Sequence, residues 1–94
     1  MKTYTIRVVL HGASWSDYDD LQDNLKVAGV VDTIVGSDGC RYKLPPAEYA
    51  TESNLTAEQV RDAVYKIASA IKPIPAVFVT QSSGRVWIGL EQVS

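Results

Sequence analysis

The chain has 94 residues, which is enough for one hydrophobic core but not for two independent ones. Its 46% hydrophobic and 21% charged residues are ordinary for a globular domain, and its formal net charge is −2. Proteins that grip duplex DNA non-specifically carry a marked basic excess, so we expect no binding of double-stranded DNA. Any contact with nucleic acid must depend on a local cluster of cations.

The apolar residues are also distributed as in a cytoplasmic protein. No window approaches the length of a membrane span, and residues 1–5 lack the apolar core of a signal peptide. The single Cys40 has no disulfide partner in the chain, which fits a reducing compartment. We therefore expect one cytoplasmic domain over residues 1–94, without membrane contact.

The first element is predicted by strict alternation. In Thr3–His11, the side chains of Tyr4, Ile6, Val8 and Leu10 fall on one face, as in a strand that is covered by a core on one side only. Gly12 then ends the strand. One broad face of this strand should be buried and the other accessible.

A helix and a hairpin follow. Residues 15–28 have an apolar stripe at helical spacing, with Ser14 or Ser16 as N-cap. A short strand over 30–35, a glycine turn over 36–39 and a return strand over 40–44 predict a β-hairpin. The double proline after this hairpin ends strand pairing, because proline has no N–H to donate. Residues 47–51 are predicted to be an extended segment at the edge of the sheet.

The second half of the chain repeats the helix–strand alternation. Thr56 and Gln59 have the spacing of a capping box, and the helical period then continues to about residue 71. Two strands over 76–80 and 85–90 flank a four-residue loop, which predicts a second hairpin. The order predicts an α+β, ferredoxin-like β-α-β-β-α-β two-layer sandwich with an additional C-terminal strand, with both helices on one face of the sheet.

The other face of that sheet is the candidate site. In a ferredoxin-like sheet the first and third strands are central neighbours, so their outward residues should lie together. On the last strand, Val86, Ile88 and Leu90 should face inward, which places Arg85 and Trp87 outward. The predicted nucleic-acid-binding residues are Arg7, Arg41, Lys43, Arg85 and Trp87, with His11 nearby.

Cations interleaved with an aromatic side chain suit single-stranded RNA, because they neutralise phosphates and stack a base. His11 is the candidate catalytic residue, since histidine exchanges protons near neutral pH and RNA cleavage needs such a group. Two simpler interpretations stay open. Arg and Lys are common at outward strand positions, and the open face could instead pair with another subunit that covers Trp87 and Val9.

No metal or cofactor site is predicted. Asp17, Asp19, Asp20 and Asp23 lie near the start of the first helix, where the helix dipole alone favours negative charge. The chain has no phosphate-binding loop, dinucleotide fingerprint or zinc-ligand spacing.

Several segments resemble one known family. The segments YTIRVVLH, GSDGCRYKLPPAEY, LTAEQV and VTQSSGRVW, with a Ser16-Asp17-Tyr18 helix start, are similar to the GhoS-like family of small antitoxin endoribonucleases and its bacterial and prophage relatives. The resemblance implies a ferredoxin-like fold similar to the small CRISPR-adaptation nucleases, and cleavage of a membrane toxin's messenger RNA. Those nucleases use an aspartate at the end of the first strand, where this chain has Leu10-His11-Gly12.

The sequence is therefore compatible with two functions. The first is a GhoS-like antitoxin-type protein that acts on single-stranded RNA, with endoribonuclease activity implied by the resemblance. The alternative is a non-catalytic module of prophage or phage origin, which binds a protein partner or self-associates as a homodimer.

Overall fold

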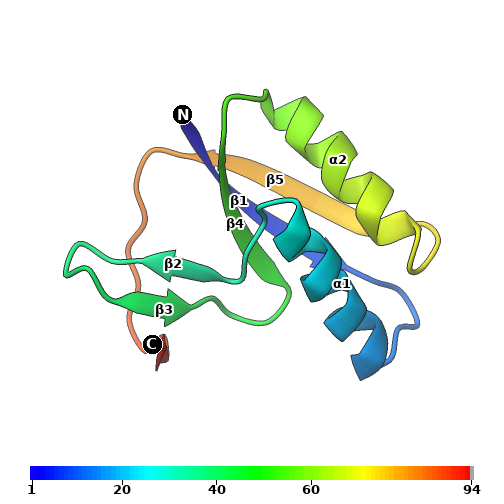
Figure 1. The fold of residues 1–94 in the computed structure, drawn as a ribbon, viewed down its shortest axis with the longest axis horizontal. Helices are drawn as coiled ribbons and strands as arrows, with labels where there is room; N and C mark the ends of the chain where they lie inside the picture. Colours follow the sequence, from blue (N-terminus) through cyan, green and yellow to red (C-terminus); the bar gives the residue numbers. More distant parts are fainter. Residues whose placement is uncertain (94) are drawn as a thin grey trace.

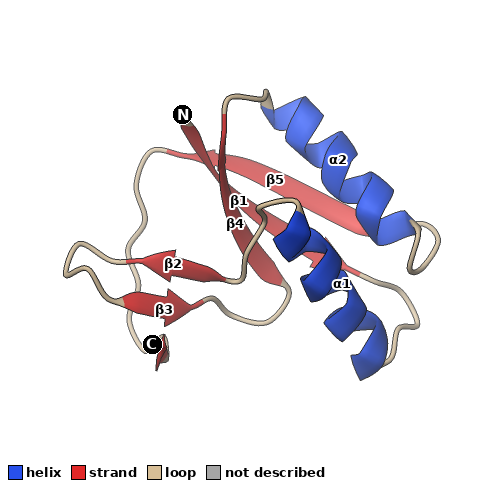
Figure 2. Cartoon of the chain, viewed as in Figure 1, coloured by secondary structure: helices blue, strands red, loops and turns tan. Residues whose placement is uncertain are grey.

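The computed structural model describes residues 1–93. Two helices and six strands alternate along them (Figures 1 and 2). In chain order these are β1 (Lys2–Val9), α1 (Trp15–Val27), β2 (Thr33–Val35), β3 (Arg41–Lys43), β4 (Glu48–Ser53), α2 (Ala57–Ser69), β5 (Ala76–Ser82) and β6 (Gln92–Val93). The mixed α+β class predicted from the sequence is confirmed.

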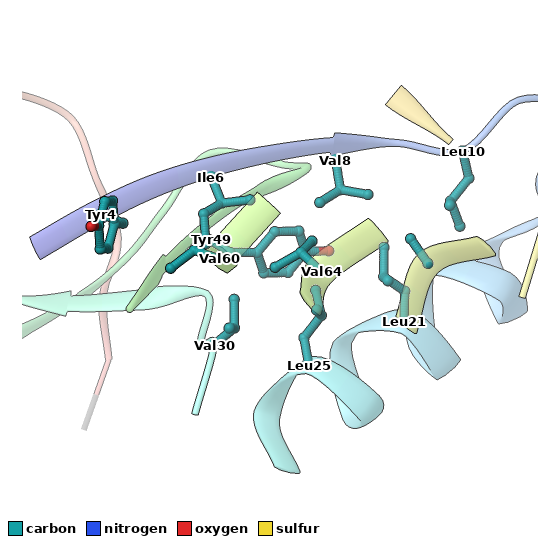
Figure 3. Packing of buried hydrophobic residues seen from close by; sticks show 11 residues of the cluster. Tyr4, Ile6, Val8, Leu10, Leu21, Leu25, Val30, Tyr49, Val60 and Val64 are labelled. Carbon is teal, nitrogen blue, oxygen red and sulfur yellow. The ribbon is translucent and has the colours of Figure 1, made fainter. Parts of the chain in front are cut away.

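The larger sheet is antiparallel and has the order β4-β1-β5, with β1 in the centre. The predicted alternation of β1 is confirmed, because Tyr4, Ile6 and Val8 are fully buried. They pack on the helices, as Figure 3 shows for residues from both layers. The same core cluster includes Leu10, Leu21, Leu25, Val30, Tyr49, Val60, Val64 and Ala68.

Both helices begin at the predicted caps. Ser14 accepts a hydrogen bond from the backbone of Asp17, whose carboxylate accepts one in return from the Ser14 backbone. Thr56 and Gln59 form the same reciprocal pair at α2. These bonds satisfy N–H groups that a helix start otherwise leaves without partners.

The smaller sheet has the order β2-β3-β6 and projects beside the larger one (Figure 1). Its β2–β3 hairpin is the one predicted from the glycine turn. An antiparallel bridge between Val31 and Ala50 connects the chain just before β2 to β4. Beneath the hairpin, Ile34, Leu44 and Ala50 form a second, smaller buried cluster.

The segment after the double proline corrects one prediction. Residues 48–53 form β4, which pairs with β1 from Lys2 to Arg7, whereas β3 lies in the other sheet. The expectation that the strand over 40–44 is the neighbour of the first strand was therefore wrong. Ala47 has a positive φ of 68°, so the chain turns sharply after the prolines. The strand that follows places Tyr49, which is 2% exposed, in the main core.

The predicted strand over 85–90 is also wrong. Residues 85–91 form an extended crossing segment without strand pairing, and the C-terminal strand is the two-residue β6, which pairs with β3. Val86 and Ile88, expected to face inward, are 99% and 97% exposed. Gly89 has a φ of 82°, a left-handed conformation that interrupts an extended strand. The hairpin expected between residues 76–80 and 85–90 is therefore not formed, and within the described residues β5 pairs with β1 alone.

Candidate nucleic-acid interface

The predicted cationic platform is divided between the two sheets. Arg7 projects from β1, and its Nη1 lies 4.0 Å from Oε2 of Glu48 on the neighbouring strand. Arg41 and Lys43 instead belong to β3 in the smaller sheet. The sequence-based expectation of one shared face for Arg7, Arg41 and Lys43 therefore fails, because β3 does not pair with β1.

A cleft nevertheless brings two of the predicted arginines together. Arg41 and Arg85 line a cavity of about 240 Å³ between the sheets, together with the hydroxyl-bearing residues Thr3, Thr33 and Thr51. A second cavity of about 300 Å³ shares Arg85 with the first and extends to Trp87 and the serines of the 82–84 turn. We call these two adjoining cavities the inter-sheet cleft.

Arg85 is held in place by the backbone and side chains of β1. Its Nε donates a hydrogen bond to Oγ1 of Thr5 at 2.9 Å, and its Nη2 donates one to the carbonyl of Tyr4 at 2.9 Å. These bonds anchor the crossing segment to the larger sheet, and they fix the half-buried guanidinium at the edge of the cleft. The two hydrogen bonds hold the guanidinium in one position, although an arginine side chain has several rotatable bonds.

Arg41 reaches the same cleft from the opposite sheet. Its Nη1 donates a hydrogen bond to Oγ1 of Thr33 at 2.8 Å, across the β2–β3 pair. Within residues 1–93, no carboxylate lies within 4.0 Å of the guanidinium of Arg41 or Arg85. Glu52 also lines the cleft, without an ion pair to either arginine. Both cations thus keep N–H groups available for an anion.

Trp87 supplies an aromatic surface at the other end. Its ring packs on Tyr42 with a centroid separation of 5.5 Å and an interplanar angle of 56°, and the side chain stays 37% exposed. The Tyr42 hydroxyl donates a hydrogen bond to Asp38 at 2.6 Å. This bond lowers the pKa of Asp38 and raises that of Tyr42. It also orients the tyrosine ring against which the tryptophan rests.

Gly36 explains how close these rings approach the hairpin turn. A Cβ at this position would lie 2.8 Å from Oδ1 of Asp38, 3.1 Å from the Trp87 ring and 3.2 Å from the Tyr42 ring. A side chain here would therefore displace the Asp38 carboxylate and push both rings outward. The sequence indicated a turn here, but not that two aromatic rings lie against it.

His11 and Lys43 are not part of the cleft. Thr3 lines the cleft, and Val9 is the last residue of β1, so the strand separates the two ends by about 20 Å at its usual rise per residue. His11 lies beyond Val9 and is exposed. Lys43 is exposed on β3, outside the lining of either cavity. The structure thus separates the candidate proton-transfer group from Arg41, Arg85 and Trp87.

A third cavity of about 430 Å³ lies beside α1 and is lined by Gln22, Asp32, Arg41 and Tyr49, among others. The Tyr49 hydroxyl is buried and makes no hydrogen bond. Figure 3 shows this ring lying among apolar core residues. Burial, with the charge of Asp32 adding to it, raises the pKa of Tyr49 to about 12. The Gln22 side chain lies close enough to the hydroxyl to oppose this rise in part, although the geometry of a hydrogen bond is not completed.

The described residues contain no grouping of three or more His, Cys, Asp or Glu side chains suited to a metal ion. Over residues 1–93, neither helix has the length and apolar character that crossing a bilayer requires.

No protein-family model matches the chain, and no curated protein matches its sequence.

Proposed function

We propose that this protein binds single-stranded RNA in the inter-sheet cleft. The observation that carries the proposal is the pairing of Arg41 and Arg85 across the cleft, where neither guanidinium is neutralised by a carboxylate of residues 1–93. Arginine recognises phosphate through several N–H donors at once. The chain as a whole has a net charge of −2, but Arg41 and Arg85 line the same cavity and make it locally favourable for an anion.

The rest of the cleft suits a nucleotide rather than a simple anion. Threonine and serine hydroxyls along both cavities can donate to or accept from ribose hydroxyls and base edges. The exposed part of Trp87 offers a stacking surface for one base, an interaction worth about 1–3 kcal/mol in single-strand binders. Both cavities are too small for a duplex, so a single strand with splayed bases is the proposed ligand.

The finer fold assignment supports the same proposal. We propose that the domain is a ferredoxin-like variant, in which the sheet order β5-β1-β4 is continued by the bridge from Val31 to Ala50. The β2–β3 hairpin then projects from the remnant of the fourth strand and forms one wall of the cleft. This agrees with the layout that the GhoS-like resemblance implies. An antitoxin-type role in a reducing cytoplasm, on a bacterial or prophage transcript, remains part of the proposal.

Binding is the proposed activity, and cleavage is a separate question. His11 lies roughly 20 Å or more along the chain from the cleft, so it cannot act on a phosphate held by Arg41 and Arg85. Endoribonuclease activity, which the resemblance implies, would need another group or a second binding surface near His11. Incubating labelled RNA with the wild type and with His11→Ala addresses that question directly.

The test of binding uses two cations on the same strand. Arg41 and Lys43 both lie exposed on β3, but only Arg41 lines the cleft. We expect Arg41→Gln to weaken binding of a fluorescently labelled single-stranded oligonucleotide about tenfold, because it removes one charge-assisted hydrogen-bonding group. Lys43→Gln removes the same charge from the same strand and should change binding less than about twofold.

Salt dependence provides a second readout. Removal of one cation that pairs with a phosphate should reduce the slope of log affinity against log salt by about 0.7 for a single strand. Arg41→Gln should therefore show a shallower slope, and Lys43→Gln an unchanged one. Equal effects of the two variants would mean that only the total charge matters. No detectable binding by the wild type at low salt would overturn the proposal.

A further inference from the structure

The outer edge of β5 is the longest unprotected strand edge in the described residues. β5 pairs with β1 on one side over seven consecutive residues, without a bulge, and no strand of residues 1–93 pairs with its other side (Figure 1). Alternate N–H and C=O groups of this strand therefore point away from the sheet. Such an edge is a template for a further strand.

The usual protections of a free edge are missing from β5. Its sequence, AVFVTQS, has no charged residue and no proline within the strand. The two other strands longer than three residues both carry charges, with Lys2 and Arg7 in β1 and Glu48 and Glu52 in β4. Natural sheets commonly guard their edges with charges, proline or bulges.

The side chains of β5 are apolar on both faces. Phe78 points away from the helices, opposite Arg7 in the register, and is 69% exposed. Val77 and Val79 face the helices and pack on the main core, yet they are only partly buried. A neighbouring strand would cover part of the exposed surface of these side chains.

We propose that β5 pairs antiparallel with β5 of a second copy, which joins two larger sheets into one sheet of order β4-β1-β5-β5-β1-β4. A second copy fits because an uncharged strand can lie opposite itself without facing like charges, as a two-fold interface requires. When the two-fold axis passes near Val79, the middle residue of β5, Phe78 lies opposite Thr80 of the other copy. The two Phe78 side chains are then diagonal neighbours on one face, within reach of aromatic contact.

Self-association and RNA binding can be tested separately at Phe78 and Val79, which do not line the inter-sheet cleft, whereas Ser82 at the end of β5 does. Sedimentation equilibrium and light scattering from about 1 µM to about 1 mM should show a dimer of twice 10.3 kDa that dissociates on dilution. Phe78→Lys places two cations beside the axis and should weaken dimerisation at least tenfold. Trp15→Lys makes the same change at an 87%-exposed position on α1 and should leave the dimer unchanged.

Amide hydrogen exchange identifies the surface used. In a monomer, alternate β5 amides face solvent and exchange quickly, whereas edge pairing protects both sets as the concentration rises. Thr80→Lys, at an exposed residue, is a second disrupting variant if Phe78→Lys does not fold by circular dichroism. The proposal is overturned by a protein that stays monomeric throughout, or by a dimer whose outward β5 amides remain unprotected.

Discussion

Two buried tyrosines in the same core should respond oppositely to removal of their hydroxyl groups. The Tyr49 hydroxyl has no hydrogen-bond partner, and the residue is 2% exposed. A buried polar group without a partner costs about 1–3 kcal/mol. Removing one oxygen leaves a void on the order of 10 Å³, which costs only about 0.2 kcal/mol. We therefore expect Tyr49→Phe to increase the free energy of unfolding by about 1 kcal/mol.

Tyr4 provides the matched control. It is fully buried, and its hydroxyl donates a hydrogen bond to the carbonyl of Leu55 at 2.6 Å. Tyr4→Phe removes a satisfied donor, so it should decrease the free energy of unfolding by about 1 kcal/mol. The two substitutions delete the same atom from the same residue type. Only the presence of a partner differs.

The assay is urea and thermal unfolding followed by circular dichroism. A change of about 1 kcal/mol should move the melting temperature by about 4–8 °C in a domain of this size, upward for Tyr49→Phe and downward for Tyr4→Phe. Destabilisation by Tyr49→Phe would refute the reasoning and indicate that Gln22, which lies near the hydroxyl, hydrogen-bonds to it in solution. In that case Tyr49→Phe should become stabilising in a Gln22→Met background, because the hydroxyl has then lost its partner.

Three further predictions concern pH and the crossing segment. Because the pKa of Tyr49 is raised from 10.0 to about 12 on folding, the unfolded state loses this proton first, so ionisation of Tyr49 leaves the free energy of unfolding unchanged below pH 10 and lowers it as pH rises from 10 toward 12. Spectrophotometric titration should show one fewer late-ionising tyrosine in Tyr49→Phe than in the wild type, with the raised pKa of Tyr42 present in both. Gly36→Ala should separate Trp87 from Tyr42, seen as a change in near-ultraviolet circular dichroism with unchanged far-ultraviolet signal. Arg85→Gln should loosen the crossing segment, raising proteolysis between residues 83 and 91 while the main core stays folded.

The elements that sequence alone predicted are those fixed by local chemistry. Alternation identified β1, and reciprocal caps at Ser14 and Thr56 identified both helix starts. Strand pairing depends instead on interactions between distant segments. The buried Tyr49 and the left-handed Ala47 select β4 as the neighbour of β1, and neither is evident from a propensity pattern.

Some residues of the candidate site were predicted correctly, but the surface on which they lie was not. Arg41, Arg85 and Trp87 do lie around one hollow, but this hollow is a cleft between two sheets instead of an open sheet face. The alternation of Val86 and Ile88 resembled a strand, although both side chains are exposed. Nothing local to that segment reveals that the Arg85 guanidinium binds the backbone of β1, 81 residues earlier in the chain.

The most direct test of RNA binding in the inter-sheet cleft is the fluorescence of Trp87. The chain has two tryptophans, so Trp15→Phe leaves Trp87 as the single reporter, and Trp87→Phe leaves Trp15. Titration with a single-stranded oligonucleotide should quench the emission of Trp87 in the first variant, because a base stacks on its exposed ring. The emission of Trp15 in the second should not change. Quenching of Trp15 alone, or binding that leaves Trp87 unaffected, would contradict the assignment of the cleft.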